Sequence, residues 1–354
     1  MHVRPGRGTY GPGNRRNRQF CTSHRIPLPF SFVIYHNHVP QKQVGLPQIL
    51  RWKLGMAKKE APHPALASLP AVETSTPVVA TDLQAIHAPA DPSRLQVTWI
   101  GHSSFLIQHH GRNVLTDPVF GHAVTQVPGF RVRRESSAGL RMEDLPPVHE
   151  VLISHNHYDH LDAATVKRLA RSASSPRFWV PSGLSAWFRR KGIAGVQELA
   201  WGESQALEAN IQLHCVPAQH FAARTPFDRD HTHWCGWVLR SADRTLYFAG
   251  DTGYNSSDFK ALGERFGGMD LSLIPIGAYR PRWIMKPVHA DPFEAVQIHE
   301  DVRSKRSIGC HWGTFRLTDE PLHEPPALLN IALAEKGISP ANFSVLALGE
   351  TVVV

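Results

Sequence analysis

The sequence contains few cysteines and no long apolar segment. Its four cysteines, Cys21, Cys215, Cys235 and Cys310, form no C-x-x-C pair. This spacing argues against a disulfide framework and against a thiolate zinc knuckle. No run approaches the roughly 20 apolar residues that span a bilayer, and the N-terminus lacks an apolar signal core with a small-residue cleavage site. We therefore expect a cytoplasmic protein that does not span a membrane.

Acidic residues are missing from the N-terminal part of the chain. Of the 38 Lys and Arg residues, 11 precede Glu60, which is the first acidic residue, and the remaining 27 face 30 Asp and Glu. The net charge of +8 therefore comes from the first 59 residues, and the rest of the chain is mildly acidic. Residues 1–32 are rich in Gly, Pro, Asn and Arg and offer no apolar face, which predicts a disordered arm. Nucleic acid, an anionic lipid surface and a mitochondrial presequence remain alternatives for it.

Two short segments precede the region of regular structure. Residues 47–59, "PQILRWKLGMAKK", carry an imperfect apolar stripe among basic residues, which could dock on the body, on a second subunit or on a membrane surface. Residues 60–93 hold six prolines among Ala, Ser and Thr, which predicts a linker or a strap on the body. From Arg94 onward, strand and helix patterns continue to Val354. The predicted division is an arm (1–32), an amphipathic segment with a strap (33–93) and a catalytic domain (94–354).

Capping residues mark several helices of an α+β fold. Asp162 is a natural N-cap for a helix over residues 163–171. Asp291 and Glu294 predict a capping box at the start of a helix over residues 292–303. Further helices, each followed by a glycine, are predicted over residues 184–191, 258–266 and 326–336.

The stretch "SHNHYDHLD" holds three histidines and two aspartates. His155 and His157 lie two positions apart at the end of the apolar strand "EVLISH", so their side chains point the same way. Two converging imidazoles suit a borderline-soft divalent ion such as zinc. Asp159 and His160 follow where the chain turns into a helix, and they project past the first pair. They predict a second ion beside the first.

Three later strands each end in one metal-competent side chain. His220 ends "CVPAQH", Asp251 ends "YFAGD" and His311 ends "SIGCH". Together with the first cluster they supply six or seven ligands, as a two-metal site needs. An aspartate can bridge two ions because each of its oxygens can hold one.

These motifs resemble the metallo-β-lactamase superfamily, whose H-x-H-x-D-H run stands here at residues 155–160. The stretches "TWIGHSSF", "LTDPVF", "AGDTGY" and "HWGTFRLTDEPLHEPP" are most similar to the branch of N-acylphosphatidylethanolamine-hydrolysing phospholipases D. The resemblance runs from about Ile49 to the C-terminus. It implies a four-layer αβ/βα sandwich with two zinc ions at one edge, and hydrolysis of a phosphodiester by a metal-bridging hydroxide.

The resemblance also implies a role for each ligand by position. It implies that one zinc ion is bound by three histidines, His155, His157 and His220. It implies that the other is bound by Asp159, His160 and His311, with Asp251 bridging the two ions. Asp117 of "LTDP" matches a carboxylate that steadies the ligands from behind, although a turn residue before Pro118 is an equal alternative. Asp251, Asp159 and His289 are the expected catalytic residues.

The loop at residues 277–289, "GAYRPRWIMKPVH", is expected to lie over the metals. His289 could donate a hydrogen bond or a proton to phosphate. The other candidates for substrate contact, cationic or polar groups for phosphate and apolar groups for acyl chains, are Tyr279, Arg280, Arg282, Trp283, Met285 and Lys286.

Other functions stay open at this stage. The same metal site could hydrolyse lactones, and a non-catalytic metal-binding protein is a further alternative. Cleavage of nucleic acid is disfavoured, because only 31 positions separate His220 from Asp251 and leave little room for an inserted domain. An amidohydrolase barrel also begins with His-x-His, but the Asp-His continuation disfavours it. The expected partners are a phospholipid or another phosphodiester, and contact with a membrane surface and a homodimer are both left open.

Overall fold

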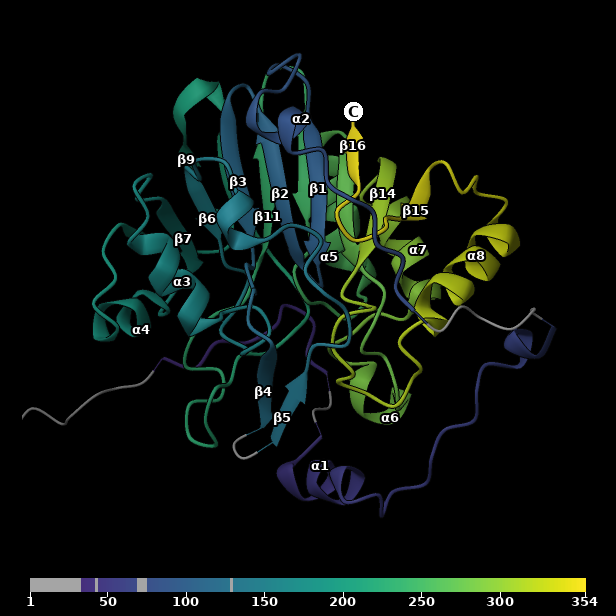
Figure 1. Ribbon diagram of the computed structural model, residues 1–354. Helices are drawn as coiled ribbons and strands as arrows, with labels where there is room; N and C mark the ends of the chain where they lie inside the picture. Colours follow the sequence, from purple (N-terminus) through teal and green to yellow (C-terminus); the bar gives the residue numbers. More distant parts are fainter. Residues whose placement is uncertain (1–32, 42–43, 69–74, 128–129) are drawn as a thin grey trace, which may run out of the picture. The chain divides into compact units, whose positions relative to one another are not determined.

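The computed structural model describes residues 33–41, 44–68, 75–127 and 130–354. The prediction of a disordered arm over residues 1–32 lies outside the described residues. Within residues 33–354, two seven-stranded sheets pack through a shared core and helices cover their outer faces (Figure 1). This arrangement confirms the four-layer αβ/βα sandwich and excludes the amidohydrolase barrel.

The first sheet joins an antiparallel part to a parallel part. Its strands are β1 (Gln96–Gly101), β2 (Ser104–His109), β3 (Arg112–Thr116), β6 (Glu150–Leu152), β7 (Arg177–Pro181), β8 (Val196–Leu199) and β16 (Thr351–Val353). Their order is β16-β1-β2-β3-β6-β7-β8. Strands β16 to β3 are antiparallel neighbours, whereas β3, β6, β7 and β8 run parallel. Helices α3 (Ala163–Ala170) and α4 (Ser185–Arg190) connect the parallel strands.

The second sheet has the same two-part construction. Its strands are β9 (Ser204–Ala206), β10 (Gln212–Val216), β11 (Gly236–Arg240), β12 (Thr245–Phe248), β13 (Met269–Pro275), β14 (Ser304–Cys310) and β15 (Phe343–Val345). Strands β9 to β12 are antiparallel neighbours, and β12 to β15 run parallel. Helices α5 (Ser256–Phe266), α7 (Pro292–Asp301) and α8 (Glu324–Lys336) pack beside this sheet (Figure 1).

The alternation of side chains along β2 separates two cores. Phe105 and Ile107 belong to the core between the sheets, and Leu106 belongs to the core beneath α3 and α4. Successive side chains of a strand point to opposite faces, so a strand buried on both sides is apolar throughout. Each fully buried side chain of this size contributes about 1.5–3 kcal/mol.

The helix caps follow the sequence predictions closely. The Asp162 side chain accepts a hydrogen bond from the backbone of Ala164, and Asp291 and Glu294 form the capping box of α7. The predicted end of α7 at residue 303 is wrong, because the helix ends at Asp301 and Arg303 has a φ of +55°. A left-handed residue breaks the helical hydrogen-bond pattern and turns the chain into β14.

The segments before β1 lie on the body of the protein. In α1 (Leu46–Lys53), Trp52 Nε1 donates to both carboxylate oxygens of Asp319 at 2.9 Å. Trp52 also packs against Ile284 and Met285 of α6 (Arg282–Met285). Farther along, Thr76 Oγ1 donates to the Gly313 carbonyl at 2.6 Å. Of the sequence alternatives, docking on the body and a strap are therefore the ones observed.

Several short elements were not predicted from the sequence. They are η1 (Pro64–Ser68), α2 (Leu83–His87), the hairpin of β4 (Ala123–Val127) and β5 (Phe130–Arg133), η2 (Met142–Asp144), η3 (Glu208–Asn210) and α6. Each has too few residues to show a clear hydrophobic period. In the described part of the chain, every helix is too short or too polar to cross a membrane.

Candidate metal centre

Loops that follow strands of both sheets bring the seven candidate ligands together. Ligand atoms of the first group lie within 4.8 Å of one another, and the group is His155, His157, His220 and Asp251. The second group meets the same limit and consists of His102, Asp159, His160 and His311. The convergence of four separate strand ends, on which the sequence argument depends, is thus observed. The role of each side chain as a metal ligand stays a prediction.

The carboxylate of Asp251 faces both groups. Its Oδ2 lies 3.1 Å from His160 Nε2 and 3.2 Å from His311 Nε2 in the second group. The same oxygen lies 3.8 Å from His220 Nε2 and 3.9 Å from His155 Nε2 in the first group. Asp251 therefore lies between the two groups, and its role as a bridging ligand stays a prediction.

Neutral imidazoles form the first group. His157 Nδ1 lies 2.8 Å from His155 Nε2 and 3.2 Å from His220 Nε2. Burial lowers the pKa of His157 and of His220 to about 3. Burial also holds the pKa of His155 well below its ordinary value. Near neutral pH these rings therefore offer unprotonated nitrogens, the form that binds a metal ion.

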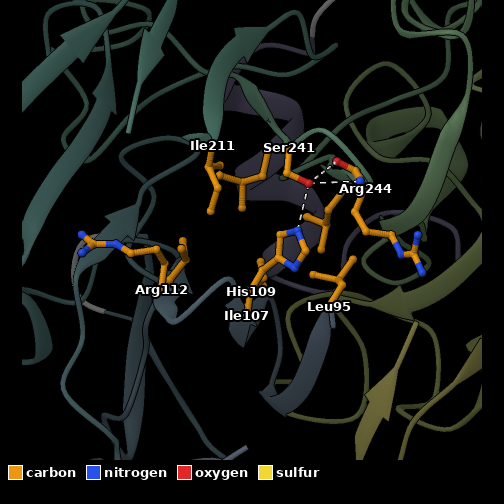
Figure 2. Close-up of a pocket in the computed structure, with 10 residues that line it drawn as sticks. Leu95, Ile107, His109, Arg112, Ile211, Ser241 and Arg244 are labelled. Atoms are coloured by element: carbon orange, nitrogen blue, oxygen red, sulfur yellow. Dashed lines mark hydrogen bonds between the residues drawn. The ribbon is translucent and has the colours of Figure 1, made fainter. Parts of the chain in front are cut away.

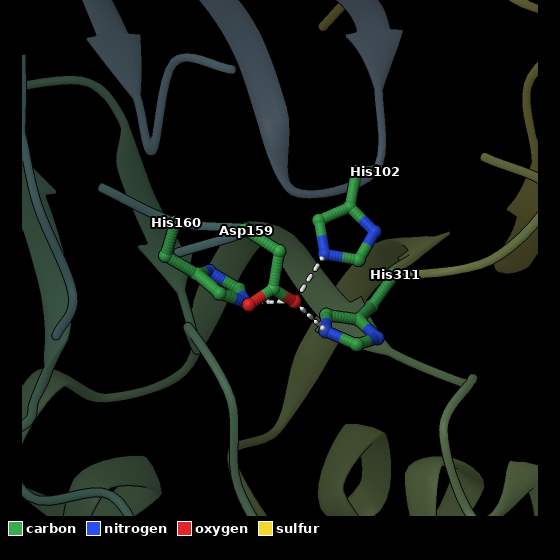
Figure 3. A group of neighbouring side chains, drawn as sticks. All are labelled: His102, Asp159, His160 and His311. Atoms are coloured by element: carbon green, nitrogen blue, oxygen red, sulfur yellow. Dashed lines mark hydrogen bonds and ion pairs between the residues drawn. The ribbon is translucent and has the colours of Figure 1, made fainter. Parts of the chain in front are cut away.

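The second group places one carboxylate, that of Asp159, among three imidazoles (Figure 3). Asp159 Oδ2 lies 2.9 Å from His102 Nε2, 3.4 Å from His160 Nε2 and 3.5 Å from His311 Nε2. Burial alone would raise the pKa of Asp159, but His160 and the hydrogen bond from His102 outweigh it and hold the pKa well below its usual range. For His311 the directions are reversed. Burial alone would lower its pKa, but the charge of Asp251 outweighs burial and raises the pKa to about 9. Burial also opposes protonation of His160, but the neighbouring carboxylates hold its pKa well above its ordinary value, so a cation bound here must displace a proton from both rings.

His102 is a member of the cluster that the sequence reasoning missed. It follows β1 within the "TWIGHSSF" stretch, and its Nε2 lies 2.9 Å from Asp159 Oδ2. Its place after an apolar strand is the same signal that identified His220 and His311. The pattern of a histidine directly after an apolar strand could therefore have identified His102 as a member of the cluster.

The residues of the cluster fit divalent cations. Asp251 Oδ1 is buried and has no hydrogen-bond partner among the described residues. A buried carboxylate oxygen without a partner is unfavourable, and a bound cation would satisfy it. The donor set consists of imidazole nitrogens and carboxylate oxygens without a thiolate, which suits zinc and also iron or manganese.

Asp117 supports the cluster from behind. Its carboxylate accepts hydrogen bonds from Ser154 N at 2.7 Å, from Ser154 Oγ at 2.5 Å and from His160 Nδ1 at 2.7 Å. Because Nδ1 of His160 is held by Asp117, its Nε2 is presented to Asp251. This position matches the expected supporting carboxylate.

Two glycines allow the ligand loops to approach closely. Gly250, with a φ of +62°, precedes Asp251, and a Cβ there would lie 2.7 Å from the Ser154 side chain. A Cβ at Gly277 would overlap the carbonyl oxygen of His311. Larger residues at either position would push the ligand-bearing loops apart.

The guanidinium of Arg224 holds the first ligand loop in place. Its Nη1 donates to the carbonyl oxygens of Asn156 at 2.7 Å and of Leu161 at 2.9 Å. The same group lies 3.9 Å from the centroid of the Tyr158 ring. No sequence motif marks this residue, because its partners are backbone carbonyls that any sequence provides.

His289 lies beside the cluster, as the sequence predicted. Its ligand atom is within 4.8 Å of those of Asp251 and His311. The Nδ1 atom is buried and has no hydrogen-bond partner in the part of the chain that the structure describes. Burial holds the pKa of His289 well below its ordinary value, so the ring is neutral. Its role toward a substrate stays a prediction.

Three of the predicted substrate residues have partners inside the protein. Tyr279 Oη donates to Glu324 at 2.6 Å, and Arg280 Nη2 donates to the Ala61 carbonyl at 2.8 Å. Arg282 forms a 2.6 Å ion pair with Glu294. Internal partners thus bind the polar groups that phosphate contacts at these positions would need.

The other three predicted substrate residues lie on or next to α6. Trp283 and Lys286 are exposed, and Met285 is buried against Trp52. Only Trp283 therefore presents a large apolar surface to a ligand, and Met285 has the packing role.

A second histidine group lies near a small cavity between the sheets (Figure 2). His109 Nε2 is 2.9 Å from Ser241 Oγ, and His110 Nε2 is 2.9 Å from Asp243 Oδ1. These polar atoms satisfy one another. The cavity, lined by Leu95 among others, has a free volume of about 10 Å³, close to that of one water-sized sphere. It is too small for a substrate.

Comparison with known proteins places the chain in a family. The Beta-lactamase superfamily domain matches residues 112–312. The chain is 39% identical over 268 residues to the N-acyl-phosphatidylethanolamine-hydrolyzing phospholipase D 1 of Caenorhabditis elegans, covering 73% of this chain and 75% of that protein. It is 33% identical over 280 residues to the mitochondrial N-acyl-phosphatidylethanolamine-hydrolyzing phospholipase D of Saccharomyces cerevisiae, covering 76% of this chain and 59% of the yeast protein.

A solved structure supports the fold independently. A metallo hydrolase from the hyperthermophilic archaeon Ignicoccus hospitalis superposes with a TM-score of 0.57 at 21% identity. The match covers 74% of this chain and 98% of the archaeal one. The chain is therefore a metal-dependent hydrolase of the metallo-β-lactamase superfamily and belongs to its N-acylphosphatidylethanolamine-hydrolysing phospholipase D branch.

Proposed function

We propose that the chain is a dinuclear-zinc phosphodiesterase of the phospholipase D type, acting on N-acylphosphatidylethanolamine-like phospholipids. The observation that carries this proposal is the place of Asp251, whose Oδ2 faces His160 and His311 on one side and His155 and His220 on the other. The names of the nematode and yeast relatives support the substrate class.

The side chains of the cluster prepare the site for this reaction. Two divalent cations, when bound, supply a water of lowered pKa and neutralise charge on the phosphate oxygens. His155, His157 and His220 present unprotonated nitrogens to the first position. The carboxylates of Asp159 and Asp251 offset positive charge at the second position.

His289 is proposed to orient the phosphodiester. Its ring centroid lies 5.0 Å from that of His220 and 5.4 Å from that of His311. A neutral imidazole at this place carries one N–H, which can donate a hydrogen bond to a non-bridging phosphate oxygen. His289 therefore favours one orientation of the substrate over the cluster.

An exposed apolar face near α6 supports a lipid substrate. Leu50, Leu54 and Met56 are exposed in and after α1, and Trp283 is exposed on α6. The two helices are joined by the contact of Trp52 with α6 and lie at the same end of the protein (Figure 1). Exposed apolar side chains interleaved with cations such as Lys58 suit the surface of a bilayer. We propose peripheral contact with a membrane here.

The experiment that tests the function follows the oxygen of water. Vesicles containing N-acylphosphatidylethanolamine are incubated with the zinc-loaded protein in H₂¹⁸O, and the products are identified by mass spectrometry. We expect N-acylethanolamine and a phosphatidic acid that carries ¹⁸O on phosphorus, because water attacks phosphorus directly. Release of diacylglycerol, or turnover confined to a lactone panel or labelled RNA, would contradict the proposal.

A further inference from the structure

The described N-terminal segment, residues 33–41, contacts the chain next to one candidate ligand. Asn37 Nδ2 donates to the carbonyl oxygen of His220 at 2.9 Å, and Asn37 Oδ1 accepts from the backbone N–H of His220 at 3.1 Å. One amide side chain thus binds both polar groups of the same residue, 183 positions away. This pairing imitates the hydrogen bonds that a neighbouring strand would provide.

The amide of Asn37 is itself held in a fixed orientation. Its Oδ1 accepts a second hydrogen bond, from Trp234 Nε1 at 2.9 Å. Trp234 is almost fully buried, and its Nε1 also lies 3.0 Å from the Ala218 carbonyl. A rigid indole donor fixes which end of the amide is the oxygen, so the nitrogen must face the His220 carbonyl.

The position of the His220 side chain depends on the hydrogen bonds between Asn37 and the His220 backbone. Its place is beyond the regular pairing of β10, which ends at Val216 opposite Gly236. The ring is held at Nδ1, which lies 2.8 Å from the Val288 carbonyl, so Nε2 is directed to His157 and Asp251. The contact of Nδ1 with Val288 sets the direction of the ring, and the backbone that Asn37 binds sets the point from which the side chain extends.

The same segment reaches the loop of Asp251 through Gln219. The Gln219 side chain donates to the Val39 carbonyl at 2.9 Å and accepts from Asn255 Nδ2 at 3.1 Å. The backbone N–H of Gln219 donates to Thr252 Oγ1 at 2.8 Å, next to Asp251. The N-terminal segment is therefore connected to both loops that carry these ligands.

We propose that Asn37 is a positioning residue of the metal centre, which fixes the backbone of His220 so that its Nε2 completes the first metal position. The sequence reasoning treated residues 33–93 as a segment outside the catalytic domain. The contacts of Asn37 make residues 35–39 part of the site instead. The inference rests on the proposed role of His220 as a metal ligand.

The test compares two neighbouring residues of the segment in the full-length protein. Asn37→Ala removes both bonds to His220. His38→Ala is the matched control, because His38 Nδ1 lies 2.9 Å from Asp258 Oδ1 and fastens the segment without touching His220. Each protein is equilibrated with buffered free zinc, and its zinc content is measured by elemental analysis. Competition with a chelator then measures the affinity of the protein for the more weakly bound zinc ion.

We expect the wild type and His38→Ala to hold two zinc ions. Asn37→Ala should hold one at the same free zinc and recover the second, together with kcat, at roughly 10–100-fold higher free zinc, as is typical when a residue behind a ligand is lost. Unchanged affinity in Asn37→Ala, or an equal loss in His38→Ala, would overturn the inference.

A conservative variant keeps the test decisive if Asn37→Ala does not fold. Asn37→Asp keeps the shape and the acceptor for Trp234, removes the donor to the His220 carbonyl and adds a negative charge. We expect weaker affinity for the second zinc here too, although the added carboxylate by itself attracts cations, and unchanged affinity overturns the inference. A wild type that binds fewer than two metal ions contradicts the proposed function itself, which separates the two failures.

Discussion

Asp117 and His160 form a buried hydrogen bond of 2.7 Å between a carboxylate oxygen and Nδ1. This contact selects the tautomer of His160 that presents Nε2 to the cluster. The pair is out of reach of solvent, since both side chains have no exposed surface. Its contribution is therefore to hold the ligand rather than to touch a substrate.

Replacing this carboxylate by an amide should weaken the second metal position. Asp117→Asn keeps the volume but removes the charge that stabilises the Nδ1 proton of His160. We expect metal affinity or kcat to fall by roughly 10–100-fold, as for other residues behind metal ligands. Zinc titration and steady-state kinetics measure the effect, and Asp144→Asn, which changes a half-buried carboxylate paired with the exposed Arg141, is the control. Equal behaviour of the two variants would rule out a supporting role for Asp117.

Loss of His102 should act through Asp159. The 2.9 Å contact between His102 Nε2 and Asp159 Oδ2 restrains the carboxylate that faces His160 and His311. We expect His102→Ala to lower kcat about 10–100-fold and to weaken the second metal. His102→Gln, which can still donate a hydrogen bond, should recover part of the loss. If Gln and Ala are equally impaired, the hydrogen bond is not the cause.

The exposed apolar face should matter for lipid substrates alone. A variant with Leu50, Leu54 and Met56 changed to Ser removes the apolar side chains exposed in and after α1. Turnover of vesicles should fall several-fold, and turnover of soluble bis(p-nitrophenyl) phosphate should not change, because the cluster is untouched. A parallel loss on both substrates would indicate damage to the fold instead of a lost membrane contact.

Removal of the Asp251 charge should abolish hydrolysis without unfolding the chain. Asp251→Asn conserves volume, and the neighbouring histidines hold the pKa of the native carboxylate well below its usual range although burial opposes this. The side chain is therefore ionised at neutral pH, and the amide variant lacks the charge that would bridge two cations. Circular dichroism checks the fold and the ¹⁸O assay checks activity. Retained activity in Asp251→Asn would be incompatible with a two-metal mechanism.

The main features of the site could be predicted because they depend on local geometry. His155 and His157 are two positions apart after a strand, and the period of a strand places them on one side. His220, Asp251 and His311 also follow apolar strands, and strand ends meet at sheet edges. The resulting convergence needs only the topology, which the apolar runs and helix caps indicate.

Other features depend on tertiary contacts that have no local pattern. Asn37 reaches His220 across 183 positions, and Arg224 binds carbonyl groups that any sequence provides. Arg282 is bound by Glu294 rather than exposed for phosphate, and the capping-box pattern that identified Glu294 does not indicate this second partner. Such pairings are decided by packing, so a loop cation alone does not indicate a substrate contact.

Anomalous diffraction at the zinc absorption edge, measured on crystals of the zinc-loaded protein, tests the central claim most directly. Our account predicts two peaks about 3.5–4 Å apart. One should lie among His155, His157 and His220, the other among Asp159, His160 and His311, and the carboxylate of Asp251 should stand between them. A single peak, or peaks remote from Asp251, would contradict it.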